Sequence, residues 1–147
     1  MSEHGWAKDM ADRIRKHREK RTSESEEKQA EWSLVEANAP VVWEEIKASV
    51  QANIKALNAA LGEERLVWSS ASNHEAKVGL GAGPYTASAE AKLDPHSFVL
   101  STVLVSTHHE LKPQMVSGKL YFCDRGGVTK SPERIAEEMI ACLEEYI

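Results

Sequence analysis

Residues 40–61 read PVVWEEIKASVQANIKALNAAL and form the longest amphipathic pattern in the chain. Charged and polar residues separate the apolar positions, which is typical of a helix with one buried face. The apolar side chains recur at steps of three or four residues, at Trp43, Ile46, Val50, Ile54, Leu57 and Leu61. Pro40 either begins this helix or kinks a longer one, and Gly62 suits the left-handed position that ends it.

After this helix the apolar pattern changes to a period of two, which indicates strands. We expect strands over residues 65–71, 75–80, 85–93, 97–107 and 115–124, with a short edge at 128–130. Short turns between consecutive strands favour an antiparallel meander of four to five strands. Residues 108–113 are expected to form a loop.

Two of these strands have unusual compositions. One face of residues 85–93 carries mostly alanine, so a bulky neighbour must approach it closely. Residues 97–107 contain no charge and are apolar on both faces, which predicts a central strand that is covered on both sides. A two-layer domain covers only one face, so the second cover would be the N-terminal helical segment or another subunit.

Ser131-Pro132-Glu133 is a typical helix start, with a serine cap, proline at the first position and an early acid. The fold class that follows is α+β: a long N-terminal helical region, the meander and a C-terminal helix, in a two-layer helix-on-sheet arrangement. This order resembles many small soluble bacterial-type domains, and no single family supplies functional residues.

Residues 1–37 are expected to form a charged helical arm, and residues 38–147 a single α+β domain. The arm carries eight basic and nine acidic side chains. It has too little apolar surface to fold alone, so it is partly mobile or packs on a partner. Ser23 and Glu26 have capping-box spacing, which predicts a second helix from about Glu24. The candidate interaction residues are its apolar and aromatic ones, Trp6, Met10, Ile14, Trp32 and Val35.

Charge and composition limit the classes of partner that the chain is expected to bind. The net charge is −5, and the basic run at residues 13–21 contains no aromatic residue for base stacking, so the sequence argues against nucleic acid. We expect no secretory signal and no membrane span. Cys123 and Cys142 lack a disulfide or metal spacing, which predicts reduced thiols in a cytoplasmic protein.

Chemical motifs are few. His108, His109 and Glu110 are the best metal-like cluster, and solvated loop residues are the preferred interpretation. Cys123 would need a histidine base, and we place His108 and His109 at the other end of its strand. GLGAGP (residues 79–84) is assigned to a turn between strands, because no helix follows it. We expect no cofactor.

The sequence therefore favours a non-catalytic protein-interaction or assembly module that uses the helical arm and an apolar sheet face, either as a homodimer or in a complex with a protein target. The alternative is a domain that binds a small apolar ligand in a pocket between sheet and helices, near the alanine-lined strand. An enzyme is disfavoured, because paired carboxylates, a triad and a cofactor fingerprint are lacking.

Overall fold

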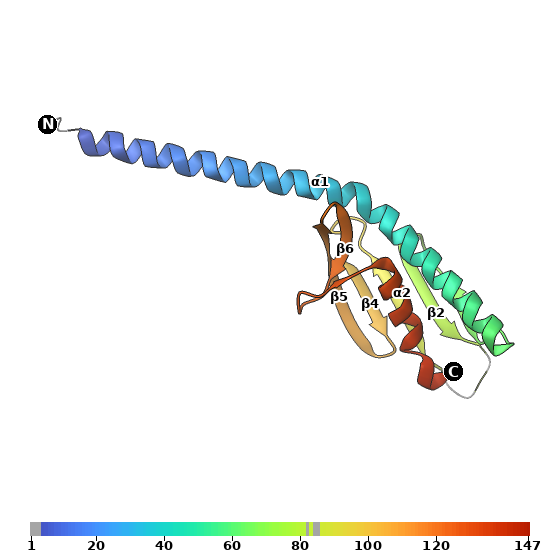
Figure 1. Ribbon diagram of the computed structural model, residues 1–147. Helices are drawn as coiled ribbons and strands as arrows, with labels where there is room; N and C mark the ends of the chain where they lie inside the picture. Colours follow the sequence, from blue (N-terminus) through green and yellow to red (C-terminus); the bar gives the residue numbers. More distant parts are fainter. Residues whose placement is uncertain (1–3, 82, 84–85) are drawn as a thin grey trace. The chain divides into compact units, whose positions relative to one another are not determined.

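The structure is a computed structural model that describes residues 4–81, 83 and 86–147. The chain's contacts divide it into two units, and the boundary in the sequence lies between Leu34 and Val35. We call residues 4–34 the arm unit and Val35–Ile147 the body unit. The secondary structure confirms the α+β class (Figure 1).

Helix α1 (Gly5–Leu61) contains 57 residues and belongs to both units. The capping box predicted at Ser23 is wrong, because the helix continues through that position. Pro40 also lies inside α1, so it does not begin the helix. Proline lacks an N–H, so the helix loses one backbone hydrogen bond at this position. Here the buried neighbours Ala39 and Val42 hold the helix against the body core.

The end of α1 follows the sequence closely. Gly62 has a φ of 71°, and its N–H donates to the Ala59 carbonyl at 3.2 Å. The Glu63 N–H donates to the Asn58 carbonyl at 3.2 Å. These two bonds form a Schellman motif, which satisfies carbonyl groups that the helix itself leaves unpaired.

In the described residues, seven strands form one antiparallel sheet in the order β1-β2-β3-β4-β5-β6-β7, so the expected meander is confirmed with more strands than predicted. Each strand pairs with the next one along the chain. Their bounds are β1 (Leu66–Ser69), β2 (Glu75–Leu80), β3 (Ser88–Leu93), β4 (Leu100–Leu104), β5 (Thr107–Val116), β6 (Lys119–Cys123) and β7 (Thr129–Lys130).

Two sequence assignments in the second half of the sheet are wrong. Residues 108–113 are not a loop but part of β5, and the single strand expected over 115–124 is two strands. Ser117 and Gly118 both have positive φ and form the two-residue turn between β5 and β6. Such turns match the twist of the flanking strands. Tyr85, where the third strand was expected to begin, lies outside the described residues.

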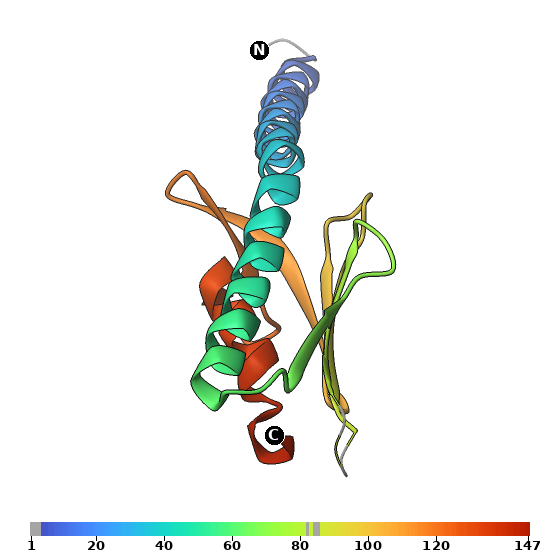
Figure 2. The ribbon, with the colours of Figure 1, turned by 90° about the vertical axis from the view of Figure 1, so that its right-hand side faces the viewer.

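The core lies between one face of the sheet and the two helices. Figure 2 shows the body part of α1 and α2 (Pro132–Ala141) on the same side of the strands. Ala89 and Ala91 of β3 are fully buried, and α2 lies against this strand. The helices contribute Val35, Ala39, Val42, Trp43, Ile46, Val50 and Ile54 from α1, and Ile135, Ala136 and Met139 from α2.

The opposite face of the sheet is charged, contrary to the expectation of two apolar faces on the fourth strand. β4 is shorter than the stretch 97–107, and on the outer face Val103 pairs with Glu90 on one side and His108 on the other. Lys92 and Glu75 form an ion pair across the outer face at 3.5 Å. Part of the apolar stretch 97–107 lies outside β4, because Val105, with a φ of 63°, is in the turn to β5.

Polar contacts fix α1 to the strand connections. The indole N–H of Trp43 and the ammonium of Lys47 both donate to the Asn73 carbonyl, at 2.6 and 3.2 Å. In the connection between β3 and β4, the Asp94 carboxylate accepts the backbone N–H groups of Ser97 and His96, and these bonds lower the pKa of Asp94 below its ordinary value. Ser131 caps α2 as predicted, accepting from the Arg134 N–H at 3.2 Å.

Candidate interaction surface

The arm unit presents an apolar stripe that nothing in its own unit covers. Trp6, Met10 and Ile14 lie at steps of four residues on α1, so they share one face of the helix. Their exposed fractions are 66%, 45% and 41%. Ala7 and Ala11 lie beside them and are partly buried. We call Trp6, Met10 and Ile14 the tip stripe.

Residues 15–31 of the arm unit are polar on all sides. Between Arg15 and Glu31 the only apolar residue is Ala30. Of the described residues 4–34, none is buried. Arg15 and Asp12 form an ion pair at 3.1 Å, with both side chains largely exposed. A helix that is polar all round gains little from packing within its own unit.

The other predicted interaction residues differ from the tip stripe. Trp32 is partly buried, whereas Val35 is only 3% exposed and belongs to the core of the body unit. Val35 is therefore a packing residue, which a partner cannot reach. Its predicted role rested on lying in the same helical segment as Trp32, and sequence alone does not show where the core begins.

The structure separates the metal-like cluster by alternation along β5. His108 and Glu110 pair with Val103 and Ser101 on the outer face, while His109 pairs with Thr102 on the opposite face. All three side chains are exposed. Within the described part of the chain, no group of three His, Cys, Asp or Glu residues is placed to hold a metal ion.

Cys123 does not lie at the position expected from the sequence, because the turn at Ser117 and Gly118 folds its strand back along β5. Cys123 pairs with Lys112, so it lies near the histidines rather than at the far end of their strand. A groove of about 510 Å³ is lined by both histidines, Glu110, Asp124, Arg125 and Gly126. The Cys123 thiol donates to the Asp124 carbonyl at 3.5 Å, and this geometry does not supply it with a base.

The second cysteine is a packed thiol. Cys142 follows α2 and donates to the Met139 carbonyl at 3.3 Å. Burial raises its pKa, because the thiolate is less well solvated there than in water. Both cysteines are free thiols, and the raised pKa of Cys142 is the opposite of what a nucleophilic cysteine needs.

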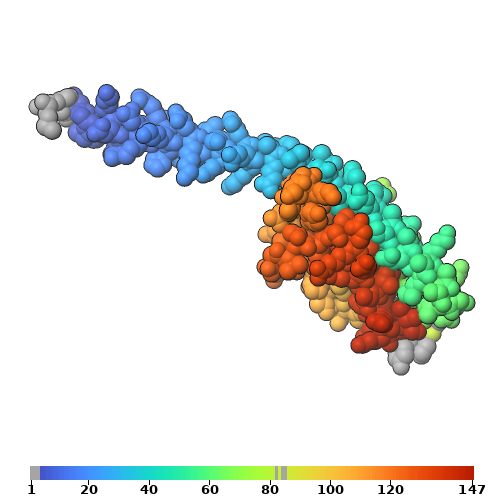
Figure 3. All heavy atoms as spheres, viewed as in Figure 1, coloured from blue at the N-terminus to red at the C-terminus, as the bar shows by residue number. Residues whose placement is uncertain are grey.

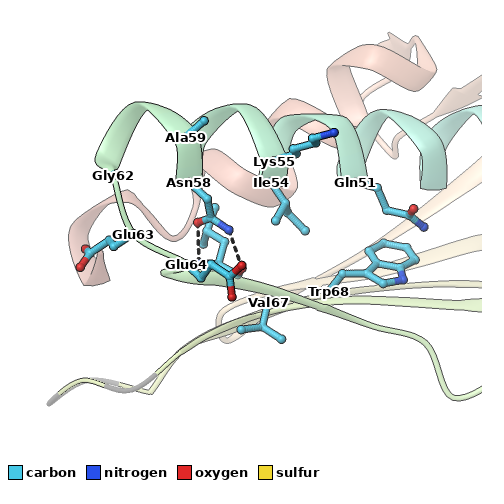
Figure 4. Close-up of a pocket in the computed structure, with 11 residues that line it drawn as sticks. Gln51, Ile54, Lys55, Asn58, Ala59, Gly62, Glu63, Glu64, Val67 and Trp68 are labelled. Carbon is cyan, nitrogen blue, oxygen red and sulfur yellow. Dashed lines mark hydrogen bonds between the residues drawn. The ribbon is translucent and has the colours of Figure 1, made fainter.

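A larger groove lies between the end of α1 and β1, as Figure 4 shows. It has a volume of about 610 Å³ and opens beside the Trp68 indole. Asn58 lies at its floor and bonds to the backbone of Leu66. Ile54 and Val67 add apolar surface, while Gln51, Lys55 and Glu64 add polar groups. This groove is not where the alanine-lined strand predicted one, since Ala89 and Ala91 are packed.

Comparison with protein-family models, with curated proteins and with solved structures gives no significant match. Among the described residues, no helix combines the length and the apolar character needed to cross a membrane. The strand connection at GLGAGP leads from β2 into the antiparallel β3, with Ala82 and Pro84 outside the described residues. A strand follows the glycines, so these residues do not form the strand–loop–helix geometry of a phosphate site.

Proposed function

We propose that the chain is a non-catalytic assembly module whose copies associate through the tip stripe of the arm unit, with a homodimer as the product. The single observation that carries this proposal is the exposure of Trp6, Met10 and Ile14 on a helix whose own unit buries nothing. Contiguous exposed apolar side chains on one helix face are typical of a protein–protein contact. Tryptophan is also among the side chains that contribute most to interfaces.

The outer face of the sheet has no part in this proposal. Four residues pair side by side across β2, β3, β4 and β5 on this face: Lys77, Glu90, Val103 and His108. Only Val103 among them is apolar. Charged residues are depleted at the centre of interfaces, so this face is a poor second contact. The two free thiols agree with a reducing compartment such as the cytoplasm.

Replacing the tip stripe by glutamine should abolish association. Glutamine keeps a good helix propensity, so Trp6→Gln, Met10→Gln and Ile14→Gln together remove apolar surface without breaking the helix. We expect the dissociation constant of the dimer to rise by about 100-fold or more, because three anchors are lost. Sedimentation velocity over a series of protein concentrations measures this directly.

The matched control removes apolar surface from exposed positions elsewhere. Val116 and Val128 are 38% and 44% exposed and lie in the sheet region. Val116→Thr with Val128→Thr should leave association unchanged. A wild-type chain that stays monomeric at every concentration would contradict the homodimer proposal.

A second candidate function is the binding of a small ligand in the groove of Figure 4. Its volume of about 610 Å³ falls within the range of roughly 300–1,000 Å³ that ligand sites occupy. The indole of Trp68 and the side chain of Ile54 would contact an apolar ligand, while Gln51 and Lys55 would orient its polar end.

Native mass spectrometry of freshly purified protein tests this second candidate. We expect an adduct on the wild-type chain that is lost with Trp68→Ala, because the indole supplies most of the aromatic contact area. Trp6→Gln removes a tryptophan outside the groove and should retain the adduct. A mass equal to that of the chain alone would count against ligand binding.

A further inference from the structure

A shallow apolar groove lies between the C-terminal part of α1 and α2 in the body unit. Five of its seven lining residues are apolar, and its volume is about 430 Å³. The lining is Asn53, Ala56, Leu57, Ala60, Glu137, Ile140 and Ala141. Figure 3 shows the surfaces of the two helices next to each other on one face of the molecule. We call this the α1–α2 groove.

The groove is suited to a helix. Ala56, Ala60 and Ala141 are exposed and small, so another backbone can approach them closely. Leu57 and Ile140 are partly buried and form the apolar floor. Leu57 continues the stripe that sequence assigned to the core, but the fully buried part of that stripe ends at Ile54. Amphipathic helices bind grooves of this kind through anchors three or four residues apart.

The face of α2 that borders the groove changes from acidic to apolar along the chain. Glu133, Glu137, Ile140 and Ala141 share this face by helical spacing. Both glutamates are exposed, and within the described residues neither forms an ion pair. The nearby ion pairs use Glu138 instead, with Lys130 and Arg134. The groove therefore has an acidic end with uncommitted charges.

The arm unit carries the complementary pattern in the opposite order. Its face begins with the tip stripe and continues with Arg13, His17 and Arg21. Arg13 follows Met10 by three residues and His17 follows it by seven. On α2, Glu137 precedes Ile140 by three residues and Glu133 precedes it by seven. The described chain gives neither Arg13 nor Arg21 an ion-pair partner.

We propose that the tip stripe of one copy docks in the α1–α2 groove of a second copy, with the arm helix antiparallel to α2. This inference rests on the proposed function and names the surface that the tip stripe binds. Only the antiparallel direction places apolar side chains on Leu57 and Ile140 while Arg13 faces Glu137. Parallel docking would put the tip stripe on the acidic end.

A second copy is the occupant that the charges favour. Residues 13–21 contain six basic residues and one acidic residue, while residues 131–147 contain five acidic and one basic. Each copy carries both the tip stripe and the groove, so two copies can exchange arms in one closed, two-fold arrangement. Two identical docking events then stabilise one dimer.

Charge reversal tests both the surface and the direction, using the full chain. We expect Glu133→Lys with Glu137→Lys to raise the dissociation constant of the dimer about tenfold or more, because attraction becomes repulsion. Arg13→Glu with Arg21→Glu should do the same. Mixing these two variants restores one arm–groove contact with swapped charges, so a mixed dimer should form in preference to either homodimer. Sedimentation velocity and native mass spectrometry measure the species.

A second pair of substitutions tests the apolar part. Ala60→Glu and Ala141→Glu change exposed positions, so the fold is retained, and each should prevent docking. The matched control Val128→Glu places the same charge on an exposed site that does not line the groove. If tip-stripe variants abolish the dimer and groove variants do not, the proposed function stands and this inference is overturned. If the wild-type chain is a monomer, the proposed function and this inference are both overturned. The same holds if the tip stripe docks in the groove of its own chain, because no dimer then forms.

Discussion

Phe122→Ala should lower the free energy of unfolding by about 3–5 kcal/mol, the range for deleting a buried aromatic side chain. Phe122 is fully buried and is the largest such side chain in the body unit. It lies on β6, between Pro113 of β5 and Lys130 of β7. Removing the ring loses its transfer free energy and leaves a cavity, because the flanking strands are held by backbone hydrogen bonds and cannot close around it.

Urea denaturation followed by far-ultraviolet circular dichroism measures this loss, provided that the slope with denaturant is unchanged. Tyr121→Ala is the matched control. Tyr121 is the preceding residue, so its side chain points to the opposite face of the sheet, and it is partly exposed. We expect about 1 kcal/mol or less for this control. Equal losses at both positions would contradict the assignment of the core to the helix-covered face.

Asn58→Ala should cost about 2–4 kcal/mol, because it leaves two backbone N–H groups without an acceptor and each costs about 1–3 kcal/mol. The Asn58 Oδ1 atom accepts from the N–H groups of Arg65 and Leu66, at 3.0 and 2.9 Å. Its Nδ2 atom donates to the Leu66 carbonyl at 2.9 Å. One side chain therefore joins the end of α1 to the start of β1, and the dashed lines at Asn58 in Figure 4 mark hydrogen bonds of this side chain.

Hydrogen exchange gives a local measurement in addition to the denaturation curve. The amide protons of Arg65 and Leu66 should lose protection in Asn58→Ala, while those of β6 lose it only as far as global stability falls. Gln51→Ala changes an exposed polar residue of the same helix and groove and should cost about 0.5 kcal/mol or less. Unchanged protection at Arg65 and Leu66 would contradict the anchoring role of Asn58.

The parts of the fold that sequence predicted depend on local chemistry. Gly62 and Ser131 were identified because each serves its own helix end through backbone geometry or a cap. β2 was predicted with its observed bounds, since turn residues flank an alternating pattern. Predictions failed where tertiary contacts set the conformation. Val105 occupies a turn with positive φ, a position that its branched side chain disfavours.

The hairpin of β5 and β6 shows the same limit. Ser117-Gly118 is a recognised turn dipeptide, but it lay inside a longer alternating pattern and was assigned to a strand. Residues His108 and His109 looked like a loop because exposed strand residues need not be apolar. In α1, Ser23 was assigned as a cap, yet a helix that has already formed propagates through such residues at little cost.

Of the two candidate surfaces, only one could be predicted from the sequence. The tip stripe was recognised from its spacing alone, because all three residues lie on one helix. The α1–α2 groove was not, because Leu57 and Ile140 come together only when two helices distant in sequence pack in the body unit. The exposed alanines at positions 56 and 60 were a signal for it, since small residues beside a leucine permit close helix approach.

The meander also bears on how the body unit folds. Every strand pairs with its neighbour in sequence, so the sheet has a low contact order for an all-antiparallel arrangement. Each hairpin closes only a short loop, and the entropy of loop closure is therefore spent in small steps. Contacts between distant segments come instead from the packing of α1 against α2 and from the guanidinium of Arg65, which donates to the Tyr146 carbonyl across 81 residues. Bringing these segments together, rather than strand pairing, is the step in which the chain must close long loops.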